Sequence, residues 1–285
     1  MSRIAYVNGR YVPHGAAFVH IEDRGYQFAD SVYEVCEVLR GELVDAPRHL
    51  ARLKRSLDEL RIAAPMADVA LIRVLREVVA RNRVVNGYVY LQVTRGVARR
   101  DHAFPSPDVR PSVVVTARAL SDAKRAATAA KGVSVITLPD LRWKRVDIKT
   151  TGLTANVMAR QAAREAGAAE AWFVDAAGFV TEGAAANAWI VTQANAVVTR
   201  KADGSILAGV TRATLIDLLK SKGLELQERS FTAAEALSAR EAFLTGATTL
   251  VTPVVAIDGQ PVGDGRPGPL ATELRRWFHD AAHHS

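Results

Sequence analysis

The sequence predicts an α+β protein of two domains, a small α/β domain followed by a larger, mainly antiparallel β domain with helices. The chain has 285 residues, of which 49% are hydrophobic, and this is enough to form two cores. Strand and helix patterns alternate over residues 1–117, whereas short strands separated by turns prevail after residue 131. The alanine-rich, polar stretch 118–131 lacks an apolar stripe and is predicted to be a linker. The predicted domains are therefore 1–117 and 132–285.

In the first domain, the pair Asn8-Gly9 between two β-forming runs predicts a two-residue hairpin turn. Strand patterns follow at 31–39, 88–93 and 112–117, with Arg40-Gly41 as a second turn. Leucines at helical spacing after Pro47, and a second set at 71–78, predict two helices that pack on the sheet.

In the second domain, strands are predicted at 132–138, 171–174, 179–181, 187–192, 196–200 and 242–245. Helices are predicted at 155–166, from Gly209 to Gly223, and near 269–281. The stretch 141–153, LRWKRVDIKTTGL, lies between the first of these strands and the first helix, at the kind of junction where α/β folds place reactive groups. Lys149 in this stretch is the candidate nucleophile, although most lysines are solvated surface charges and Arg142, Lys144 and Arg145 beside it are basic too.

Composition excludes several classes of protein. The arginines behind the net charge of +7 are spread along the chain, which argues against nucleic-acid binding, and no apolar run is long enough to span a membrane. Cys36 is the single cysteine, so a disulfide framework is excluded. Residues 1–15 lack the basic start and apolar middle of a secretory signal, so we expect a cytoplasmic protein. The nucleotide-binding and zinc-protease motifs are missing, and we expect no metal.

Two short segments are candidates for anion binding. Gly209-Val210-Thr211 at a helix start offers backbone amides and a hydroxyl to a phosphate, and Thr245 to Thr249 follows a strand. From the sequence alone, an ordinary threonine cap is the favoured explanation of the first. Arg100 and His102 lie on a loop and can both point at a carboxylate, although such pairs are usually only exposed charges.

Seven segments in order make the chain resemble the fold-type IV pyridoxal-phosphate enzymes, and among them the bacterial D-amino-acid aminotransferases. They are EDRGYQFADSVYEV from Glu22, HLARL from His49, QVTRG with RDHAFP around Arg100, LRWKRVDIK ending at Lys149, TEG from Thr181, ILAGVTR from Ile206 and TPVVAIDG from Thr252. The resemblance spans nearly the whole length, and the combination is far more specific than any single segment.

This resemblance implies pyridoxal 5'-phosphate as cofactor, with Lys149 forming a Schiff base to its aldehyde and Glu182 pairing with the pyridine nitrogen. Arg52 is implied to bind the phosphate. The other implied cofactor contacts are Leu207, Val210, Thr211, Gly246, Ala247 and Thr248. Departures from the family pattern are Ala184, Ala185 and Ala186, and Gly246-Ala247, where hydroxyl residues near the cofactor are missing.

Tyr33, Arg100 and His102 match the family's binding site for the substrate α-carboxylate, in which the arginine and histidine come from the partner chain. The resemblance therefore implies a homodimer that moves amino groups between D-amino acids, such as D-alanine and D-glutamate, and 2-oxo acids. A branched-chain or (R)-amine transaminase, or an aminodeoxychorismate lyase, is the alternative on the same scaffold. A non-catalytic, basic ligand-binding protein is the alternative from another class, and it predicts no cofactor.

Overall fold

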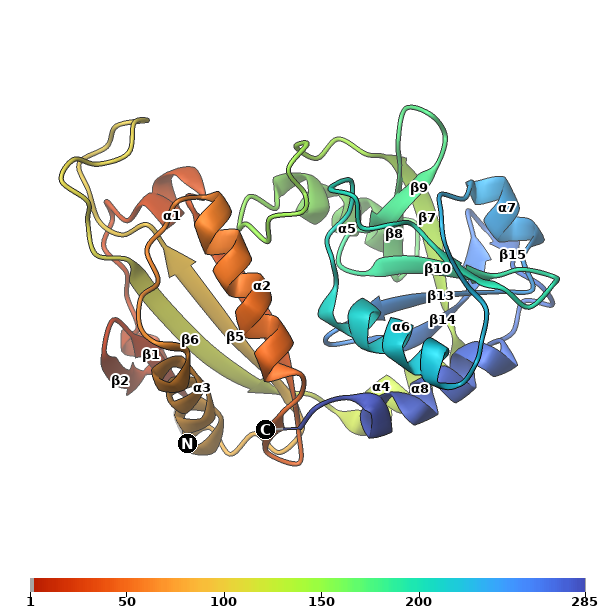
Figure 1. Cartoon of the computed structure of the whole chain (residues 1–285), viewed down its shortest axis with the longest axis horizontal. Coiled ribbons are helices and arrows are strands. Elements are labelled where there is room, and N and C mark those ends of the chain that lie inside the picture. The colour runs from red at the N-terminus through yellow and green to blue at the C-terminus, as the bar shows by residue number, and fades with distance from the viewer. Residues whose placement is uncertain (1–2, 285) are drawn as a thin grey trace. The chain divides into compact units, whose positions relative to one another are not determined.

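The structure is a computed structural model that describes residues 3–284. The chain forms two compact units, and Figure 1 shows their helices and strands. The first unit contains the described residues up to 121 together with 148–152 and 283–284, and the second contains 122–147 and 153–282. The predicted α+β class and the division into a smaller first part and a larger second part are confirmed.

The first unit is built on a six-stranded antiparallel sheet of order β2-β1-β6-β5-β3-β4. Its strands are β1 (Ile4–Val7), β2 (Arg10–Pro13), β3 (Ser31–Leu39), β4 (Glu42–Leu43), β5 (Gly87–Thr94) and β6 (Ser112–Ala119). Its helices are α1 (Arg24–Phe28), α2 (Ala46–Glu59) and α3 (Asp68–Arg81), with a 3-10 turn η1 (His14–Ala16). The strands and helices predicted for this part are confirmed within a few residues.

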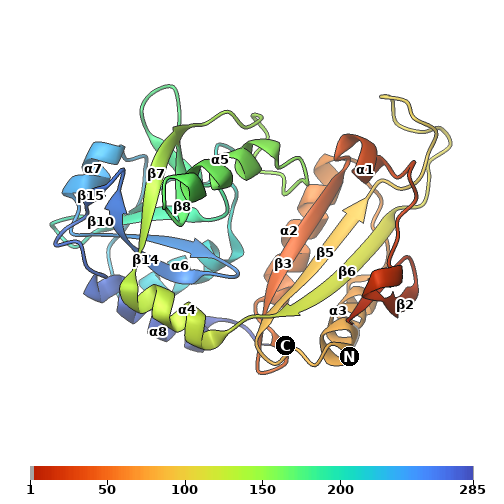
Figure 2. The ribbon, with the colours of Figure 1, turned by 180° about the vertical axis from the view of Figure 1, so that it is seen from behind.

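Local chemistry explains the turns and the two faces of this sheet. Asn8 and Gly9 both have positive φ, 47° and 95°, as the predicted two-residue hairpin requires. Helices α2 and α3 cover one face, and Figure 2 shows the other face of the sheet in front of them. The core between helices and sheet contains Leu53 and Leu75 against Leu91, whereas alternate residues such as Tyr33 and Tyr90 point to the other face.

The second unit is built on a nine-stranded mixed sheet of order β12-β11-β10-β13-β14-β7-β8-β9, with β15 added to β14. Its strands are β7 (Val133–Pro139), β8 (Glu170–Val174), β9 (Val180–Gly183), β10 (Asn187–Val191), β11 (Val197–Thr199), β12 (Leu226–Glu228), β13 (Glu241–Gly246), β14 (Leu250–Ile257) and β15 (Gln260–Pro261). Strand β7 runs parallel to β8 and β14, and β11 runs parallel to β12, while the other pairings are antiparallel.

Five helices belong to the second unit: α4 (Asp122–Lys131), α5 (Thr154–Glu165), α6 (Val210–Ser221), α7 (Ala233–Ser238) and α8 (Pro269–Ala281). Helices α6 and α8 bury one face of β10 and β13, where Trp189 and Phe243 stack with ring centroids 5.5 Å apart. Phe231 and Ala236 of the α7 region cover the opposite face. None of the helices in the described part of the chain is long and apolar enough to cross a membrane.

The predicted linker at 118–131 is wrong in its structure. Residues 118 and 119 still belong to β6, and Asp122–Lys131 form α4, which buries Ala129 and packs on β14. The helix forms because alanine has a high helix propensity. The sequence shows no apolar stripe because α4 buries only the small side chain of Ala129. The second predicted domain also needs correction, because 148–152 and 283–284 belong to the first unit.

Candidate functional site

Lys149 lies on a short segment that extends the sheet of the first unit. Its carbonyl accepts from the Tyr33 amide at 3.0 Å, Thr150 forms an antiparallel bridge with Val32, and the Thr151 amide donates to the Ser31 carbonyl at 3.2 Å. Strand β4 pairs only with the far end of β3, so this end of β3 has an open edge that the segment fills. Lys149 is thus held by backbone pairing.

The Lys149 amine lies against Tyr33. Its Nζ donates to the Tyr33 hydroxyl at 3.3 Å and lies 4.4 Å from the centre of the ring. Tyr33 in turn stacks on Tyr90, with centroids 5.7 Å apart, and burial raises the pKa of Tyr90 to about 12. The amine therefore rests on an aromatic platform with one hydroxyl as its hydrogen-bond acceptor. The structure brings these two predicted site residues into direct contact.

Arg52 is part of a buried ion-pair cluster under the same strand. Its Nε and Nη2 donate to the two oxygens of Glu34 at 2.8 and 2.7 Å, and His49 Nδ1 lies 2.7 Å from Glu34 Oε2. Burial alone would raise the pKa of Glu34, but Arg52 and His49 outweigh it and lower that pKa to about 2. Burial also lowers the pKa of His49. Glu34 and His49 were not predicted, and they fix the orientation of Arg52.

Arg100 and His102 lie on the irregular loop between β5 and β6. Both side chains are exposed, and both approach Phe28 of α1: the Arg100 guanidinium lies 5.0 Å from its ring centre, and the His102 ring 5.5 Å. In the described residues of this one chain, their side chains contact neither Lys149 nor Tyr33. The structure therefore brings Arg100 and His102 together on Phe28 but not to the other predicted carboxylate-binding residue.

The carboxylate of Asp30, whose side chain is 11% exposed, anchors this loop. Arg24 and Arg95 both donate from Nε to Asp30 Oδ2, at 2.8 and 2.7 Å. Arg24 Nη1 then reaches the Asp101 carbonyl at 2.6 Å, and the Arg95 guanidinium lies 3.7 Å from the ring centre of Phe104. The backbone beside Arg100 is thus tied down while its side chain stays exposed. Sequence reasoning missed this cluster, although Arg24 and Asp30 lie within the first segment that carries the resemblance.

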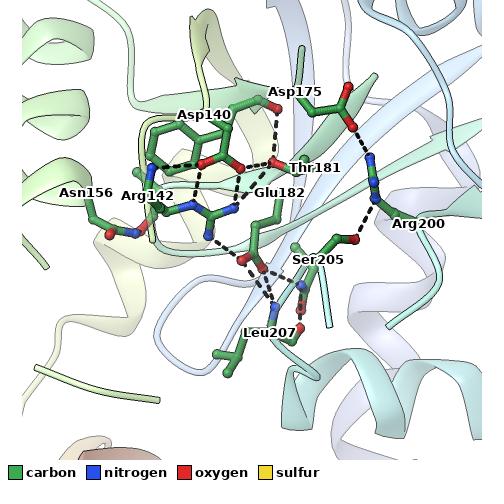
Figure 3. A network of polar contacts seen from close by, with 12 residues as sticks. Asp140, Arg142, Asn156, Asp175, Thr181, Glu182, Arg200, Ser205 and Leu207 are labelled. Atoms are coloured by element: carbon green, nitrogen blue, oxygen red, sulfur yellow. Dashed lines mark hydrogen bonds and ion pairs between the residues drawn. The ribbon is translucent and has the colours of Figure 1, made fainter. Parts of the chain in front are cut away.

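Glu182 is the centre of the polar network in the second unit (Figure 3). The residue is 5% exposed, and its carboxylate accepts from Arg142 Nη1 at 2.5 Å and from Asn187 Nδ2 at 3.0 Å. The Leu207 amide donates to both oxygens at 3.2 Å. A buried carboxylate with several donors is held in one orientation. Among the predicted site residues, the structure thus brings Glu182 and Leu207 into contact.

Arg142 lies in the same basic stretch of the sequence as Lys149. In the structure its side chain is 6% exposed and pairs with Asp140 through Nε at 2.9 Å and Nη2 at 2.7 Å. Thr181 donates to Asp140 Oδ2 at 2.8 Å, and the Phe173 ring lies 4.6 Å from the guanidinium. Burial alone would lower the pKa of Arg142, but Asp140 and Glu182 raise it overall. No local pattern marks such a buried arginine.

The start of helix α6 lies against the Glu182 network. A side-chain carbon added to Gly209 would meet Asn187 Oδ1 at 2.1 Å, so glycine is required beside this asparagine. Val210 and Thr211 follow as the first helical residues, both buried, and the cap makes no side-chain hydrogen bond. Their amides are at the positive end of the helix.

The predicted turn with Gly246, Ala247 and Thr248 connects β13 to β14. A carbon added to Gly246 would lie 3.3 Å from the Ala185 carbonyl, so this turn lies beside the alanines that depart from the family pattern. The Gly183 amide donates to the Ala186 carbonyl at 2.6 Å, and Asn156 Nδ2 donates to the Ala184 carbonyl at 2.8 Å. The alanine segment is thus held by a backbone hydrogen bond and by the Asn156 side chain, and at the β13–β14 turn the Thr252 hydroxyl donates to the Thr249 carbonyl at 2.7 Å.

The donors of each unit, taken separately, suit parts of a phosphorylated pyridine aldehyde. The second unit presents a buried carboxylate beside helix-start amides, and the first presents a lysine amine and an oriented arginine. Residues 3–284 contain no group of three or more His, Cys, Asp or Glu side chains able to hold a metal ion. Cys36 is buried, and burial raises the pKa of its thiol, so it is a core residue.

Comparison with known proteins gives consistent results. The family model described as amino-transferase class IV matches residues 31–257. D-alanine aminotransferase of Bacillus licheniformis is 41% identical over 268 residues, which cover 94% of this chain and 93% of the relative. D-alanine aminotransferase of Staphylococcus haemolyticus is 35% identical over 274 residues, 96% of each chain.

Solved structures also match over nearly the whole length. The T.th. branched-chain amino acid aminotransferase, complexed with N-(5'-phosphopyridoxyl)-L-glutamate, gives a TM-score of 0.89 at 28% identity and covers 98% of this chain and 93% of that one. The branched-chain enzyme of Escherichia coli gives the same TM-score at 23% identity, covering 98% and 94%, and indicates the fold alone.

Proposed function

Because the chain belongs to the class IV aminotransferase family, we propose that it transfers amino groups between D-amino acids and 2-oxo acids with pyridoxal 5'-phosphate as cofactor. One observation carries the choice of D-amino acids. Relatives named D-alanine aminotransferase are up to 41% identical over nearly the full length, against 28% for the branched-chain structure. The first class of relative is therefore the better guide to the substrate.

The proposed cofactor contacts follow from the donors of each unit. Lys149 supplies the amine that attaches the cofactor aldehyde, and Arg52, oriented by Glu34, binds the phosphate. Glu182 accepts a hydrogen bond from the pyridine nitrogen, and Leu207, whose amide Glu182 fixes, supports the ring. The remaining proposed contacts come from the helix start and the β13–β14 turn: Val210, Thr211, Gly246, Ala247 and Thr248.

When bound, pyridoxal phosphate stabilises the negative charge that develops at the substrate Cα. Lys149 would be the base and acid that moves the substrate Cα proton, because an amine can accept and return a proton. Tyr33 orients that amine through the 3.3 Å hydrogen bond. Arg100 and His102 bind the substrate carboxylate, since both side chains are exposed on an anchored loop and an arginine offers a charged pair of donors.

A direct assay tests this proposal. The purified protein is supplied with D-alanine, D-glutamate, L-leucine or (R)-1-phenylethylamine as donor, and with 2-oxoglutarate or pyruvate as acceptor. We expect kcat/KM for D-alanine to exceed that for L-leucine by about 100-fold, because a site that pairs its polar groups with one substrate rejects another strongly. Equal activity on L-leucine, or none on D-alanine, contradicts the proposal.

The proposal includes a homodimer in which Arg100 and His102 serve the partner's site. It is supported by their contact with Phe28 rather than with Lys149 or Tyr33 among the described residues of one chain. Mixing Lys149→Ala and Arg100→Ala chains should restore about a quarter of wild-type activity, because half of the dimers are hybrids and each hybrid has one complete site. No recovery, with hybrids shown by mass, argues for sites within single chains.

The proposal also places the enzyme in the cytoplasm, where 2-oxo acids are produced and consumed. Fractionation of the source cells, with the transaminase activity as marker, tests this location.

A further inference from the structure

Asp140, Arg142 and Glu182 form one ion-paired group. Asp140 and Glu182 share a single guanidinium, that of Arg142. Asp140 receives two parallel hydrogen bonds from it, at 2.9 and 2.7 Å, and Glu182 receives one at 2.5 Å. Because two carboxylates face one cation, the three groups together carry one negative charge.

This charge lies where water screens it little. The side chains of Arg142 and Glu182 are both 6% exposed and that of Asp140 is 14% exposed (Figure 3). Asn187 and Leu207 bring hydrogen bonds to Glu182 but no charge. Because Arg142 is shared with Asp140, it neutralises Glu182 less than it would in a simple ion pair, and Glu182 is therefore better suited to a cationic ligand.

We propose that Asp140 is a positioning residue for the cofactor. By neutralising Arg142, Asp140 leaves the charge of Glu182 to the protonated ring nitrogen of pyridoxal phosphate. Without Asp140, Arg142 alone neutralises Glu182, and the ring nitrogen meets an ion pair of zero net charge. The inference rests on the proposed function, in which Glu182 binds that nitrogen.

The contacts of Asp140 support a role in charge rather than in shape alone. Burial by itself raises the pKa of Asp140, but the hydrogen bonds and the charge of Arg142 outweigh it and keep that pKa below its usual value. Thr181, directly before Glu182 in β9, adds a hydrogen bond at 2.8 Å. Asp140 is thus an ionised carboxylate at neutral pH, fixed by two neighbours.

A purely structural role makes a different prediction. If Asp140 only anchors the loop after β7, its loss weakens every ligand of the second unit alike. If its charge acts through Arg142 and Glu182, its loss weakens only a ligand whose ring nitrogen can carry a proton. The two cases separate with 1-deazapyridoxal phosphate, which has a carbon in place of that nitrogen.

The experiment measures the dissociation constants of pyridoxal phosphate and of its 1-deaza analogue for the apoenzyme, by fluorescence titration, without any assay of activity. The ratio of the two constants is the preference for the ring nitrogen. We expect Asp140→Asn to lower this preference about tenfold, because a buried unit charge is removed. Asp140→Glu, which keeps the charge, should restore most of it.

Asp175→Asn is the matched control. Asp175 pairs with Arg200 at 2.7 Å in the same unit, and its loss should leave the preference unchanged (Figure 3). Should Asp140→Asn give no folded protein, Asp140→Ser replaces it, and far-ultraviolet circular dichroism checks the fold. An unchanged preference in the folded Asp140 variant overturns the inference.

Glu182→Gln separates the inference from the function on which it rests. If Glu182→Gln abolishes the preference while Asp140→Asn keeps it, the proposed role of Glu182 is supported and the role of Asp140 is wrong. If neither variant changes the preference, Glu182 does not bind the ring nitrogen, and both proposals fail.

Discussion

The two units hold their candidate site residues in different ways. In the second unit Glu182 meets three donors from Arg142, Asn187 and Leu207, all at 3.2 Å or less. In the first unit the Lys149 amine has one hydrogen bond, at 3.3 Å, and is otherwise held by its backbone. A group that holds a cofactor profits from rigid donors, whereas a group that moves protons must change partners. The difference suggests a division of roles between the units.

A substitution of Lys149 tests the difference between the two units most directly. Lys149→Ala should lower transaminase activity by about 1,000-fold or more, because no other group supplies the proton transfer and the cofactor attachment. The covalent part is checked by borohydride reduction followed by mass spectrometry, where the variant should show no added mass. Lys144→Ala, an exposed lysine in the same stretch, is the control and should behave as wild type. If the Lys149→Ala variant still gains the mass of the reduced cofactor, the cofactor is attached to another lysine.

The first unit also contains a rigid cluster around Glu34, which contributes to stability as well as orienting Arg52. Glu34→Gln should lower the free energy of unfolding by about 3 kcal/mol at pH 7, because Arg52 and His49 lose a buried carboxylate. Urea unfolding with a probe in the first unit measures the change.

The difference in unfolding free energy between wild type and Glu34→Gln should decrease as the pH falls. The pKa of Glu34 is about 2 in the folded chain against a usual value of 4.5. Its ionised form therefore stabilises the fold fully above pH 4.5, and this contribution is lost as the pH falls toward 2. The gap between wild type and Glu34→Gln should close over that range. A gap that stays constant between pH 6 and pH 3 would show that Glu34 does not carry it.

The Arg100 side chain offers the next test, since it is exposed on an anchored loop. Arg100→Ala should raise KM for D-alanine about 30-fold with a smaller change in kcat, because a charge-assisted contact to the substrate carboxylate is lost. Steady-state kinetics measure both constants. Arg99→Ala, the exposed neighbour, is the control. An unchanged KM would remove Arg100 from the substrate site.

A substitution of Tyr33 tests whether the single hydrogen bond of the Lys149 amine contributes to activity. Tyr33→Phe removes the acceptor of the amine and keeps the ring and its stacking on Tyr90. We expect kcat to fall about tenfold, because the amine is oriented less well for proton transfer. The borohydride label on Lys149 should remain, which distinguishes misorientation from loss of the cofactor. Wild-type kcat in this variant would assign Tyr33 to packing.

Local patterns predicted the elements better than they predicted the site. Strand β3 and helix α8 have the bounds that periodicity gave, because alternation and helical spacing are properties of neighbouring residues. The packing of Lys149 against Tyr33 depends on a pairing between distant segments, for which no local signal exists. Placing 148–152 in the second domain was wrong for this reason.

Buried charges were the other gap in the prediction. Arg142 and Asp30 have the residue types of solvated surface positions, and only partners far along the chain make their burial tolerable. The resemblance supplied Glu182 but neither the arginine paired with it nor the aspartate behind that arginine. Residues that act through others are the ones that sequence motifs leave out.

The smallest effect is expected at Arg24, which anchors the loop without facing the substrate. Arg24→Lys keeps one bond to Asp30 but loses the paired reach to the carbonyls of Asp101 and His102. We expect KM for D-alanine to rise about threefold with kcat unchanged, since the loop populates its binding position less often. Arg81→Lys, another paired arginine of the first unit, is the control. Hydrogen exchange at residues 99–104 should quicken in Arg24→Lys alone, and equal exchange in all three proteins would show that the loop keeps its position without Arg24.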